Sequence, residues 1–405
     1  MFSHIPSFAG DPIFELGNAC RRDPRADKVD LTVGLYYDED GRIPVLQCVK
    51  QAEALLAQQE RPRTYLPIEG LESYRLAVQR LVLGADSPAL NEQRVATIQS
   101  VGGTGALKVG ADFLHAAYPD SAVWISDPAW DNHFAIFSGA GIATHRYPYY
   151  DPATHGVRFD AMMDALATLP ARSIVLLHPC CHNPSGADLT AEQWGALIAL
   201  MRRGGLIPFL DLAYQGFGQG LDEDALAVRL LAESGMAYLV ANSFSKNFSF
   251  YGERCGGLSV VCEQAAHVPA VLGQLIAIVR RIYSNPPVHG AQVIARVLGD
   301  PELNRLWRDE VAAMRARIRS MRGQAVEQLA DKAPDYPARY LLAHQGMFSL
   351  TGLRPEQILM LRERHAVYLL DSGRICLPGL NTRNVGLFTD ALADVLMRTA
   401  PETHA

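Results

Sequence analysis

The middle of the chain alternates short apolar runs with longer segments that have helical spacing. Four apolar runs of strand length occupy residues 123–126, 174–178, 206–210 and 238–241. Next to them, three longer stretches repeat apolar residues at helical spacing, at residues 106–118, 191–203 and 225–234. This alternation predicts an α/β protein with a mostly parallel sheet covered by helices.

A longer amphipathic pattern follows the Asn285-Pro286-Pro287 break. Between Leu303 and about Ala330 the apolar residues recur at helical spacing, which predicts one long helix. A chain of 405 residues exceeds the size at which single cores stop growing, so we expect two domains. We predict a large domain at 46–303 and a smaller α/β domain built from 1–45 together with 304–405.

Polar residues gather directly after each of the four predicted strands. These clusters occupy residues 127–130, 179–186, 211–214 and 242–246. In open α/β sheets, ligands bind at the carboxyl ends of the strands. We therefore expect the four clusters to converge on one site.

Composition excludes several classes of partner. The net charge of −6 and the absence of a basic run argue against nucleic acid. Residues 1–20 include acidic residues and prolines and lack a long apolar core, so we expect neither a signal peptide nor an anchor. No stretch reaches the roughly 18 uninterrupted apolar residues of a membrane span. We predict a cytoplasmic protein that binds no membrane.

The cysteine pattern predicts reduced thiols. There are seven cysteines, and none belongs to a spaced CxxC pair. His178 and His182 flank Cys180 and Cys181, but prolines in this segment prevent a helix that would align the two histidines. We therefore expect no metal site.

Lys246 differs from the other four lysines. It follows an apolar run directly and lies among aromatic residues, where partial burial would lower its pKa and favour Schiff-base chemistry. A surface or structurally paired lysine is the alternative. Ser243 and Lys246 also form the SxxK pattern of penicillin-recognising enzymes, but the chain contains no KTG and the segment lacks a helix start.

A glycine-rich run lies just before the first helical pattern. Residues 101–106 read Val-Gly-Gly-Thr-Gly-Ala, so backbone N–H groups at a helix start are candidates to bind a phosphate. The run lacks the Walker lysine and the GxGxxG spacing, and a tight turn is the alternative. Together with Ser243, Ser245 and Arg254, however, it offers the neutral donors and the cation that one phosphate monoester needs.

Eight motifs in order along nearly the whole chain resemble the aspartate and aromatic amino-acid (tyrosine) aminotransferases, a class I branch of the fold-type I pyridoxal-phosphate enzymes. The motifs are Gly34-Leu35-Tyr36, Tyr65-Leu66-Pro67, residues 102–106, residues 182–186, residues 211–216, residues 243–246, residues 283–287 and Ser372-Gly373-Arg374.

The resemblance implies roles around the cofactor, pyridoxal 5′-phosphate. Lys246 would form the Schiff base and move the substrate proton. Asp211 would keep the pyridine nitrogen protonated, with a helix cap as the alternative. His133 would support Asp211, with ordinary packing as the alternative. Tyr214 and Asn183 would hydrogen-bond the phenolic oxygen and lower the Schiff-base pKa.

The resemblance also assigns the remaining contacts of the cofactor. Trp130 would stack on the ring, although a core tryptophan is the alternative. The phosphate would be bound by Gly102, Gly103, Thr104, Ser243, Ser245 and Arg254, and by Tyr65 of a second subunit.

Substrate binding follows from the same resemblance. Arg374 would bind the α-carboxylate through two parallel hydrogen bonds, near Gly34, Trp130 and Asn183. Arg280 of the second subunit would bind the distal carboxylate of aspartate or glutamate, although Arg281 is the alternative. Shared sites of this kind imply a homodimer.

The expected pocket wall favours aromatic substrates. Leu35, Tyr37 and Ile43 are similar to the aromatic-accepting members, whereas Thr104 and Asn285 are similar to the aspartate type. Burial of an aromatic ring contributes roughly 1.5–3 kcal/mol, and apolar pockets discriminate only modestly. We predict an aminotransferase that transfers the amino group of tyrosine, phenylalanine and also aspartate to 2-oxoglutarate.

Other functions remain open at this point. An aspartate-preferring aminotransferase is the nearest alternative. The same fold and lysine serve lyases, decarboxylases and racemases. A pyridoxal-phosphate domain of a transcription regulator and a nucleotide-binding or structural α/β protein are the more distant ones.

Overall fold

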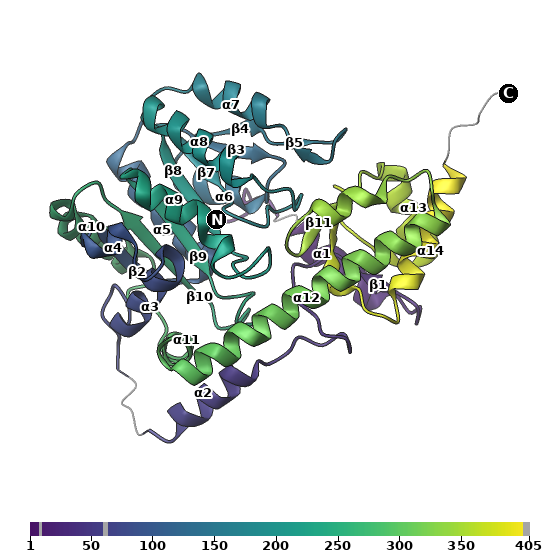
Figure 1. Cartoon of the computed structure of the whole chain (residues 1–405), viewed down its shortest axis with the longest axis horizontal. Coiled ribbons are helices and arrows are strands. Elements are labelled where there is room, and N and C mark those ends of the chain that lie inside the picture. Colours follow the sequence, from purple (N-terminus) through teal and green to yellow (C-terminus); the bar gives the residue numbers. More distant parts are fainter. Residues whose placement is uncertain (8–9, 60–63, 400–405) are drawn as a thin grey trace. The chain divides into compact units, whose positions relative to one another are not determined.

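The computed structural model describes residues 1–7, 10–59 and 64–399, and the chain divides into two compact units (Figure 1). Unit 1 comprises Met1–Ile43 and Arg317–Ala405, and unit 2 comprises Pro44–Ala316. One boundary therefore follows residue 43, where residue 45 was expected. The other follows residue 316 instead of residue 303, inside helix α12 (Pro301–Lys332).

Unit 2 is built on a seven-stranded sheet in the order β2-β10-β9-β8-β7-β3-β4. All neighbouring strands of this sheet are parallel except those paired with β10, which runs antiparallel to β2 and β9. The strands are β2 (Val95–Val101), β3 (Val123–Asp127), β4 (Thr144–Pro148), β7 (Ile174–Leu177), β8 (Ile207–Leu212), β9 (Tyr238–Ser243) and β10 (Cys255–Val261). The predicted mostly parallel α/β architecture is confirmed.

Alternate side chains of these strands face opposite sides of the sheet. Leu176, Phe209 and Leu239 belong to a buried cluster with residues of helices α5, α6 and α10. Their neighbours Leu177 and Leu210 are also buried, which shows that the second face of the sheet is covered too. The continuous apolar runs in the sequence follow from this burial on both faces.

The remaining elements of unit 2 are helices and one short hairpin. The helices are α2 (Gln47–Ala57), α3 (Glu72–Leu83), α4 (Pro88–Asn91), α5 (Gly102–Ala117), α6 (Asn132–Ser138), α7 (Phe159–Ala167), α8 (Ala191–Gly204), α9 (Leu226–Ser234), α10 (Val268–Ile282) and α11 (His289–Gly299). Strands β5 (Tyr150–Asp151) and β6 (Gly156–Val157) form the hairpin.

Unit 1 combines small sheets with helices. Strand β1 (Val29–Asp30) pairs in parallel with β12 (Val367–Tyr368), and β11 (Phe348–Leu350) pairs antiparallel with β13 (Arg374–Cys376). Its helices are α1 (Pro12–Arg22), α13 (Pro355–His365), α14 (Val385–Arg398) and the later part of α12. The first and last parts of the chain therefore share one unit.

Helix α10 is unusually apolar. Residues Ala265–Ile282 are long and apolar enough to cross a membrane by length and composition alone, and only 17% of this window is buried. Leu275, Ile278 and Val279 pack into the core beside the sheet, while Arg280 and Arg281 stand exposed at the end of the helix. One side of α10 therefore belongs to the core of unit 2.

Candidate functional site

The sheet register brings three distant segments together. Cys255 at the start of β10 pairs with Val101 at the end of β2, and Gly256 pairs with Ser243 at the end of β9. The residues just after β2, just after β9 and just before β10 therefore meet at one edge of the sheet. This geometry places the glycine run, Ser243 and Arg254 side by side, although Gly102 and Arg254 are far apart in the chain.

The start of α5 and Arg254 form a compact cradle. Gly102 N–H donates to the Arg254 carbonyl at 2.9 Å, and Arg254 Nη1 donates to Ser245 Oγ at 3.3 Å. A Cβ on Gly102, whose φ is +66°, would lie 2.6 Å from Arg254 Nη2. The helix begins at Gly102, earlier than the predicted position, and so includes Gly103 and Thr104 in its first turn. The N–H groups at this end carry the positive end of the helix dipole.

Asp211 is a buried carboxylate at the end of β8. Its Oδ2 accepts a hydrogen bond from His133 Nε2 at 2.8 Å, and both residues are buried. Burial raises the pKa of Asp211, but the His133 hydrogen bond and the nearby Lys246 outweigh that effect and hold the pKa below its usual value. Asp211 therefore stays ionised in the interior of the protein.

Behind Asp211 lies a row of buried histidines. The His178 ring lies 5.3 Å from that of His133 and 4.8 Å from that of His182. Both ring nitrogens of His182 are engaged, Nε2 with Ser126 Oγ at 2.9 Å and Nδ1 with Ser185 Oγ at 2.7 Å. Burial lowers the pKa of His178 to about 4, so this imidazole is neutral.

Lys246 lies in the segment that follows β9. Its Nζ is 5.0 Å from the centre of the Tyr214 ring. The next residue, Asn247, fixes this segment, because its Nδ2 donates to the Gln215 carbonyl at 3.1 Å and its own carbonyl accepts the Trp307 indole N–H at 2.9 Å. Lys246 and Tyr214 are therefore held close together by their neighbours in the chain.

Asn183 and Trp130 lie in the loops that follow β7 and β3. Asn183 is buried directly after His182. The Trp130 ring lies edge-on to His133, with ring centres 5.1 Å apart and planes at 83°. The strand ends and registers thus gather at one sheet edge the residues predicted to surround the cofactor: Gly102, Gly103, Trp130, Asn183, Asp211, Tyr214, Ser243, Ser245, Lys246 and Arg254.

Tyr65 and Arg280 lie on the exterior of unit 2. The Tyr65 side chain is 87% exposed, and Arg280 is exposed and hydrogen-bonded to the Ser284 hydroxyl. Asn285 Nδ2 donates to the Leu66 carbonyl at 2.8 Å, which ties the two segments together. The segments that carry these two predicted residues are therefore connected, and both residues are exposed in the single chain.

Arg374 is a buried cation of unit 1. Its Nη2 donates to the Thr32 carbonyl at 2.6 Å, and its guanidinium lies 4.3 Å from the centre of the Phe348 ring. Gly34 packs against the Cζ end of that ring, since a Cβ on Gly34 would lie 2.8 Å from Phe348 Cζ. Phe348 therefore holds Gly34 and Arg374, two predicted substrate-binding residues, in one cluster.

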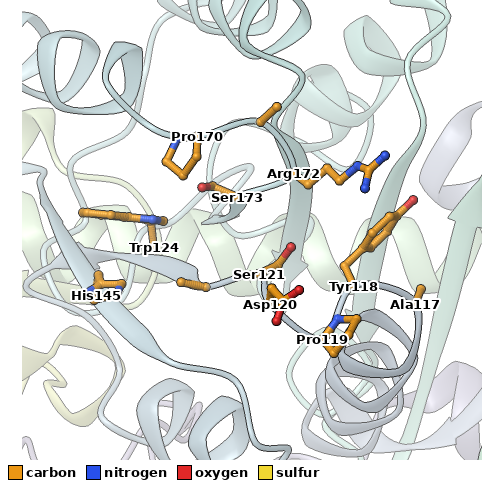
Figure 2. Close-up of a pocket in the computed structure, with 12 residues that line it drawn as sticks. Ala117, Tyr118, Pro119, Asp120, Ser121, Trp124, His145, Pro170, Arg172 and Ser173 are labelled. Atoms are coloured by element: carbon orange, nitrogen blue, oxygen red, sulfur yellow. The ribbon is translucent and has the colours of Figure 1, made fainter.

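Two cavities of similar size lie at different ends of unit 2. One of about 460 Å³ is lined by Thr104, Lys108, Arg254 and Tyr283 and adjoins the cradle. The other, of about 430 Å³, lies at the amino ends of β3 and β7, where Figure 2 shows Trp124, Tyr118 and Arg172 around it. That second cavity lies at the sheet edge opposite the cluster, whereas Thr104 and Arg254, two of the predicted cofactor-binding residues, line the first one.

Sequence reasoning missed several supporting residues. His178 and His182 were weighed only as metal ligands, and Asn247 was not considered. The ligand atoms of His133, His178 and Asp211 lie within 4.8 Å of one another, but His133 Nε2 is already hydrogen-bonded to the carboxylate. The only sequence signal for these supporting residues was that polar residues are frequent next to the apolar strands. Contacts between loops leave no pattern in a linear sequence.

Comparison with known proteins adds an independent finding. Residues 26–392 match the profile of the family described as aminotransferase class I and II. The chain is 57% identical over 397 residues to a protein of Escherichia coli (strain K12) named aromatic-amino-acid aminotransferase, and the match covers 98% of this chain and 100% of that protein.

Solved structures agree with this match. An aromatic-amino-acid aminotransferase from Burkholderia pseudomallei, covalently bound to pyridoxal phosphate, has a TM-score of 0.96 and 46% identity, with 98% of this chain and 99% of that chain covered. A psychrophilic aromatic amino acids aminotransferase from Psychrobacter sp. B6, cocrystallised with aspartic acid, has a TM-score of 0.96 and 48% identity, with coverages of 98% and 100%.

Proposed function

Because the chain belongs to the class I and II aminotransferases, we propose that it transfers the amino group of tyrosine and phenylalanine, and also of aspartate, to 2-oxoglutarate. One observation supports the chemistry most directly. Lys246 and the ionised Asp211 lie at the ends of neighbouring strands, with the Tyr214 ring 5.0 Å from the lysine nitrogen.

The enzyme is a fold-type I aminotransferase that depends on pyridoxal 5′-phosphate. The residues present fit this cofactor. A Cβ on Gly102 would fill the space beside Arg254, so the cradle has room for an anion only because this residue is glycine. Arg254, Ser243, Ser245, Thr104 and the first N–H groups of α5 would hold the phosphate.

The polar groups of the cofactor ring would have hydrogen-bond partners in the protein. Asp211, supported by His133, would hold the pyridine N–H, while Tyr214 and Asn183 would donate hydrogen bonds to the phenolic oxygen. Trp130 would lie against the ring. When bound, the cofactor supplies an electron sink for charge that develops at the substrate Cα.

Lys246 performs the proton transfer in this proposal. Its Nζ is the residue's only titratable group and takes the proton from the substrate Cα as a general base. The contacts of Asn247 with Gln215 and Trp307 fix the lysine segment, so the amine is held in place before substrate arrives.

Arg374 binds the substrate α-carboxylate in our proposal. Its contacts with Phe348 and the Thr32 carbonyl hold the guanidinium plane, which suits bidentate recognition. Arg280 would bind the distal carboxylate of aspartate, glutamate or 2-oxoglutarate from the second subunit. Its exposed position at the end of α10 in the single chain is consistent with that assignment.

The aromatic preference rests on the wall residues of unit 1. Leu35 and Tyr37 are both partly buried, and burial raises the pKa of Tyr37 to about 12, so the phenol stays neutral. The third wall residue, Ile43, is 42% exposed. A neutral, largely apolar wall favours a phenyl or phenol ring over a carboxylate. The likeness to aromatic-amino-acid aminotransferases supports the same choice.

We propose a homodimer with shared sites, in which unit 2 is the large domain and unit 1 the small one. The cavity beside Arg254 is bordered by Ile282 and Tyr283 at the end of the apolar α10, and Tyr65 is exposed. Apolar surface that is continuous with a site is typical of an interface. Tyr65 of the second subunit would then reach the phosphate.

A cytoplasmic location completes the proposal. The seven cysteines are all free thiols and all buried. Proteins of oxidising compartments more often use disulfides, whereas free thiols suit the reducing cytosol.

Steady-state transamination tests the proposed function. The wild-type enzyme is given tyrosine, phenylalanine or aspartate with 2-oxoglutarate. Lys246→Ala should reduce turnover by about 10⁴-fold or more, since it removes the base. Lys50→Ala, which changes an exposed lysine of α2, is the matched control and should retain full activity. Normal turnover in Lys246→Ala would refute the mechanism, and turnover of aspartate alone would establish the aspartate-preferring alternative.

A further inference from the structure

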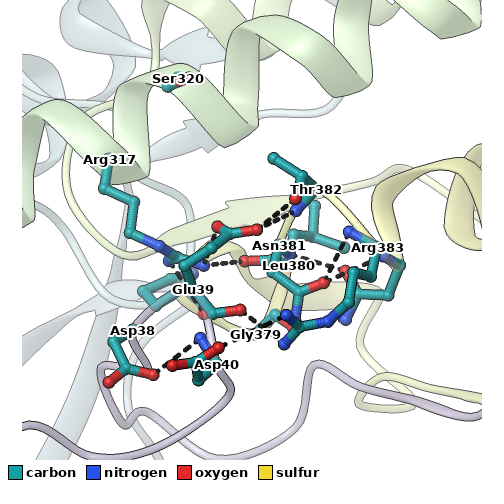
Figure 3. Close-up of polar contacts among 12 residues, drawn as sticks. Asp38, Glu39, Asp40, Arg317, Ser320, Gly379, Leu380, Asn381, Thr382 and Arg383 are labelled. Atoms are coloured by element: carbon teal, nitrogen blue, oxygen red, sulfur yellow. Dashed lines mark hydrogen bonds and ion pairs between the residues drawn. The ribbon is translucent and has the colours of Figure 1, made fainter.

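Two segments of unit 1 lie next to the proposed substrate-binding residues. Residues 34–40 contain Gly34 and the wall residues Leu35 and Tyr37. Residues 377–384 follow β13, the strand that begins with Arg374. Figure 3 shows these two segments joined by a network of polar contacts around Glu39.

The Glu39 carboxylate contacts both the second segment and helix α12. Its Oε1 accepts the Thr382 backbone N–H at 2.8 Å and also the Thr382 hydroxyl. Its Oε2 accepts Arg317 Nη2 at 3.4 Å, and the same nitrogen donates to the Leu380 carbonyl at 2.7 Å. Arg317 therefore joins α12 to both segments at once.

A second arginine, which belongs to the later segment, also contacts the earlier segment. Arg383, in the later segment, donates through Nη2 to the Glu39 carbonyl at 2.7 Å. Its Nη1 lies 3.5 Å from Asp40 Oδ1. The earlier segment is thus held through both its backbone and its side chains.

Two further contacts lie next to this network and involve the segment that contains the wall residues. The Arg317 guanidinium lies 5.9 Å from the centre of the Tyr36 ring. Tyr36 is buried, and its neighbours in the chain are Leu35 and Tyr37. Cys376 of β13 contacts the Leu35 carbonyl through its Sγ at 3.6 Å. The network around Glu39 therefore acts with the Cys376–Leu35 contact to hold the wall segment relative to β13, and so relative to Arg374.

The contacts of the Glu39 carboxylate contribute more to stability than a single exposed ion pair does. Its side chain is 44% exposed, and an isolated pair at such exposure contributes little. Here, however, the carboxylate also accepts the backbone N–H that fixes the later segment, and charged hydrogen bonds of this kind are the stronger ones. The Thr382 hydroxyl bond lowers the pKa of Glu39, which keeps it ionised.

We propose that Glu39 is a positioning residue for substrate specificity, because through Thr382 and Arg317 it fixes the wall of Leu35 and Tyr37 relative to Arg374. The inference rests on the proposed function. An aromatic substrate needs the wall and Arg374 in register, whereas a dicarboxylate has Arg280 of the second subunit as its other anchor. Loss of Glu39 therefore weakens aromatic binding selectively.

The test compares Glu39→Ala, Glu39→Gln and the control Glu356→Ala in the cofactor-bound enzyme. Glu356 is a glutamate of the same unit. It lies on α13 and pairs with Arg354, which directly precedes that helix. Calorimetry measures the Kd of 3-phenylpropionate and of succinate, which represent the two substrate classes without an amino group. Glu39→Ala should weaken 3-phenylpropionate by about tenfold and leave succinate nearly unchanged.

The conservative variant and kinetics separate positioning from plain destabilisation. Glu39→Gln keeps an oxygen acceptor for Thr382 and should restore most of the affinity, and Glu356→Ala should match the wild type. For Glu39→Ala, the KM of phenylalanine should rise while its kcat changes little. Equal weakening of both ligands, or unchanged Kd values, would overturn the proposal. Failure of the wild-type enzyme to convert phenylalanine or aspartate would instead overturn the proposed function on which it rests.

Discussion

Arg254 adopts a left-handed backbone conformation, with φ of 54°, where its guanidinium meets the start of α5. Residues other than glycine are disfavoured there by about 1–2 kcal/mol. The hydrogen bond from Gly102 N–H to the Arg254 carbonyl helps to maintain this conformation. Such strain suits a residue whose side chain must reach one point, which in our proposal is the cofactor phosphate.

Loss of the Arg254 cation should therefore weaken cofactor binding. We expect Arg254→Ala to raise the Kd for pyridoxal phosphate by about tenfold or more, because a hydrogen bond to a charged group contributes about 1.5–3 kcal/mol. The measurement is a titration of the apoenzyme with cofactor. Arg305→Ala removes an arginine that is 77% exposed on α12 and should leave the Kd unchanged. An unaltered Kd in Arg254→Ala would remove Arg254 from the phosphate site.

His178 makes stability depend on pH. Burial lowers its pKa to about 4 from the ordinary 6.5, so below pH 6.5 the unfolded chain binds a proton that the folded chain does not. The free energy of unfolding must then decrease as pH falls from about 6.5 to 4, by about 1 kcal/mol per pH unit for this histidine. Asp211 acts at lower pH, since its pKa lies below 3.8 in the folded enzyme.

Replacement of His178 tests this assignment. The slope of stability between pH 7 and pH 5 should be shallower in His178→Gln than in the wild-type holoenzyme. Urea unfolding at the two pH values, at one protein concentration, gives the comparison. His145→Gln, which changes an exposed histidine of β4, should keep the wild-type slope. Parallel slopes for wild type and His178→Gln would show that His178 does not titrate in this range.

At the scale of elements, an uninterrupted apolar run explains which buried strands the sequence revealed. The strands β3, β7, β8 and β9 were predicted because they are apolar runs with both faces covered. The strand β2 was missed because Thr97 and Gln99 interrupt its apolar pattern. These side chains are buried yet satisfied, since Thr97 bonds Ser259 of β10 at 2.9 Å and Gln99 donates to the Pro287 carbonyl at 2.6 Å. Partners so distant in sequence leave no local signal.

The residues of the candidate site also divide into those that the sequence predicted and those that it did not. Lys246 stood out because it follows an apolar run, and the other cofactor contacts came from the motif resemblance. The row of His178 and His182 behind Asp211 could not be predicted, because a histidine in a loop has no periodic pattern. Its surroundings depend on how β7 and β8 lie beside each other.

The first turn of α5 offers a test at the element scale. Gly102→Ala places a Cβ 2.6 Å from Arg254 Nη2 at a φ of +66°, so we expect a loss of about 1–2 kcal/mol in stability and weaker cofactor binding. Gly195→Ala in α8 meets nothing within 4 Å and should stabilise by about 0.5–1 kcal/mol. Thermal unfolding with and without cofactor measures both. Equal tolerance of the two changes would contradict the cradle.

At the scale of the whole molecule, the proposed shared sites predict complementation between defective subunits. Lys246→Ala lacks the base, and Arg280→Ala lacks the distal carboxylate ligand, but a hybrid dimer contains one site with both native residues. Random pairing should restore about one quarter of the wild-type rate with aspartate and 2-oxoglutarate, because half of the dimers are hybrids with one of two sites intact.

Co-expression of the two variants with different affinity tags gives the hybrid for assay. Its mass should be twice the 44.3 kDa of one chain. Mixing Lys246→Ala with itself provides the control and should give no recovery. A hybrid that stays inactive, or a monomeric enzyme that is fully active, would contradict the shared site and leave Arg280 without the proposed role.

The half-reaction without an oxo acid tests the central claim most directly. The purified pyridoxal-phosphate form is mixed separately with L-phenylalanine and with L-aspartate, and absorbance follows its conversion to the pyridoxamine form. We predict conversion by both amino acids, because Lys246 and Arg374 act on either and the wall of Leu35 and Tyr37 accepts the aromatic ring. Conversion by aspartate alone would contradict the aromatic assignment, and conversion by neither would contradict the proposed aminotransferase mechanism.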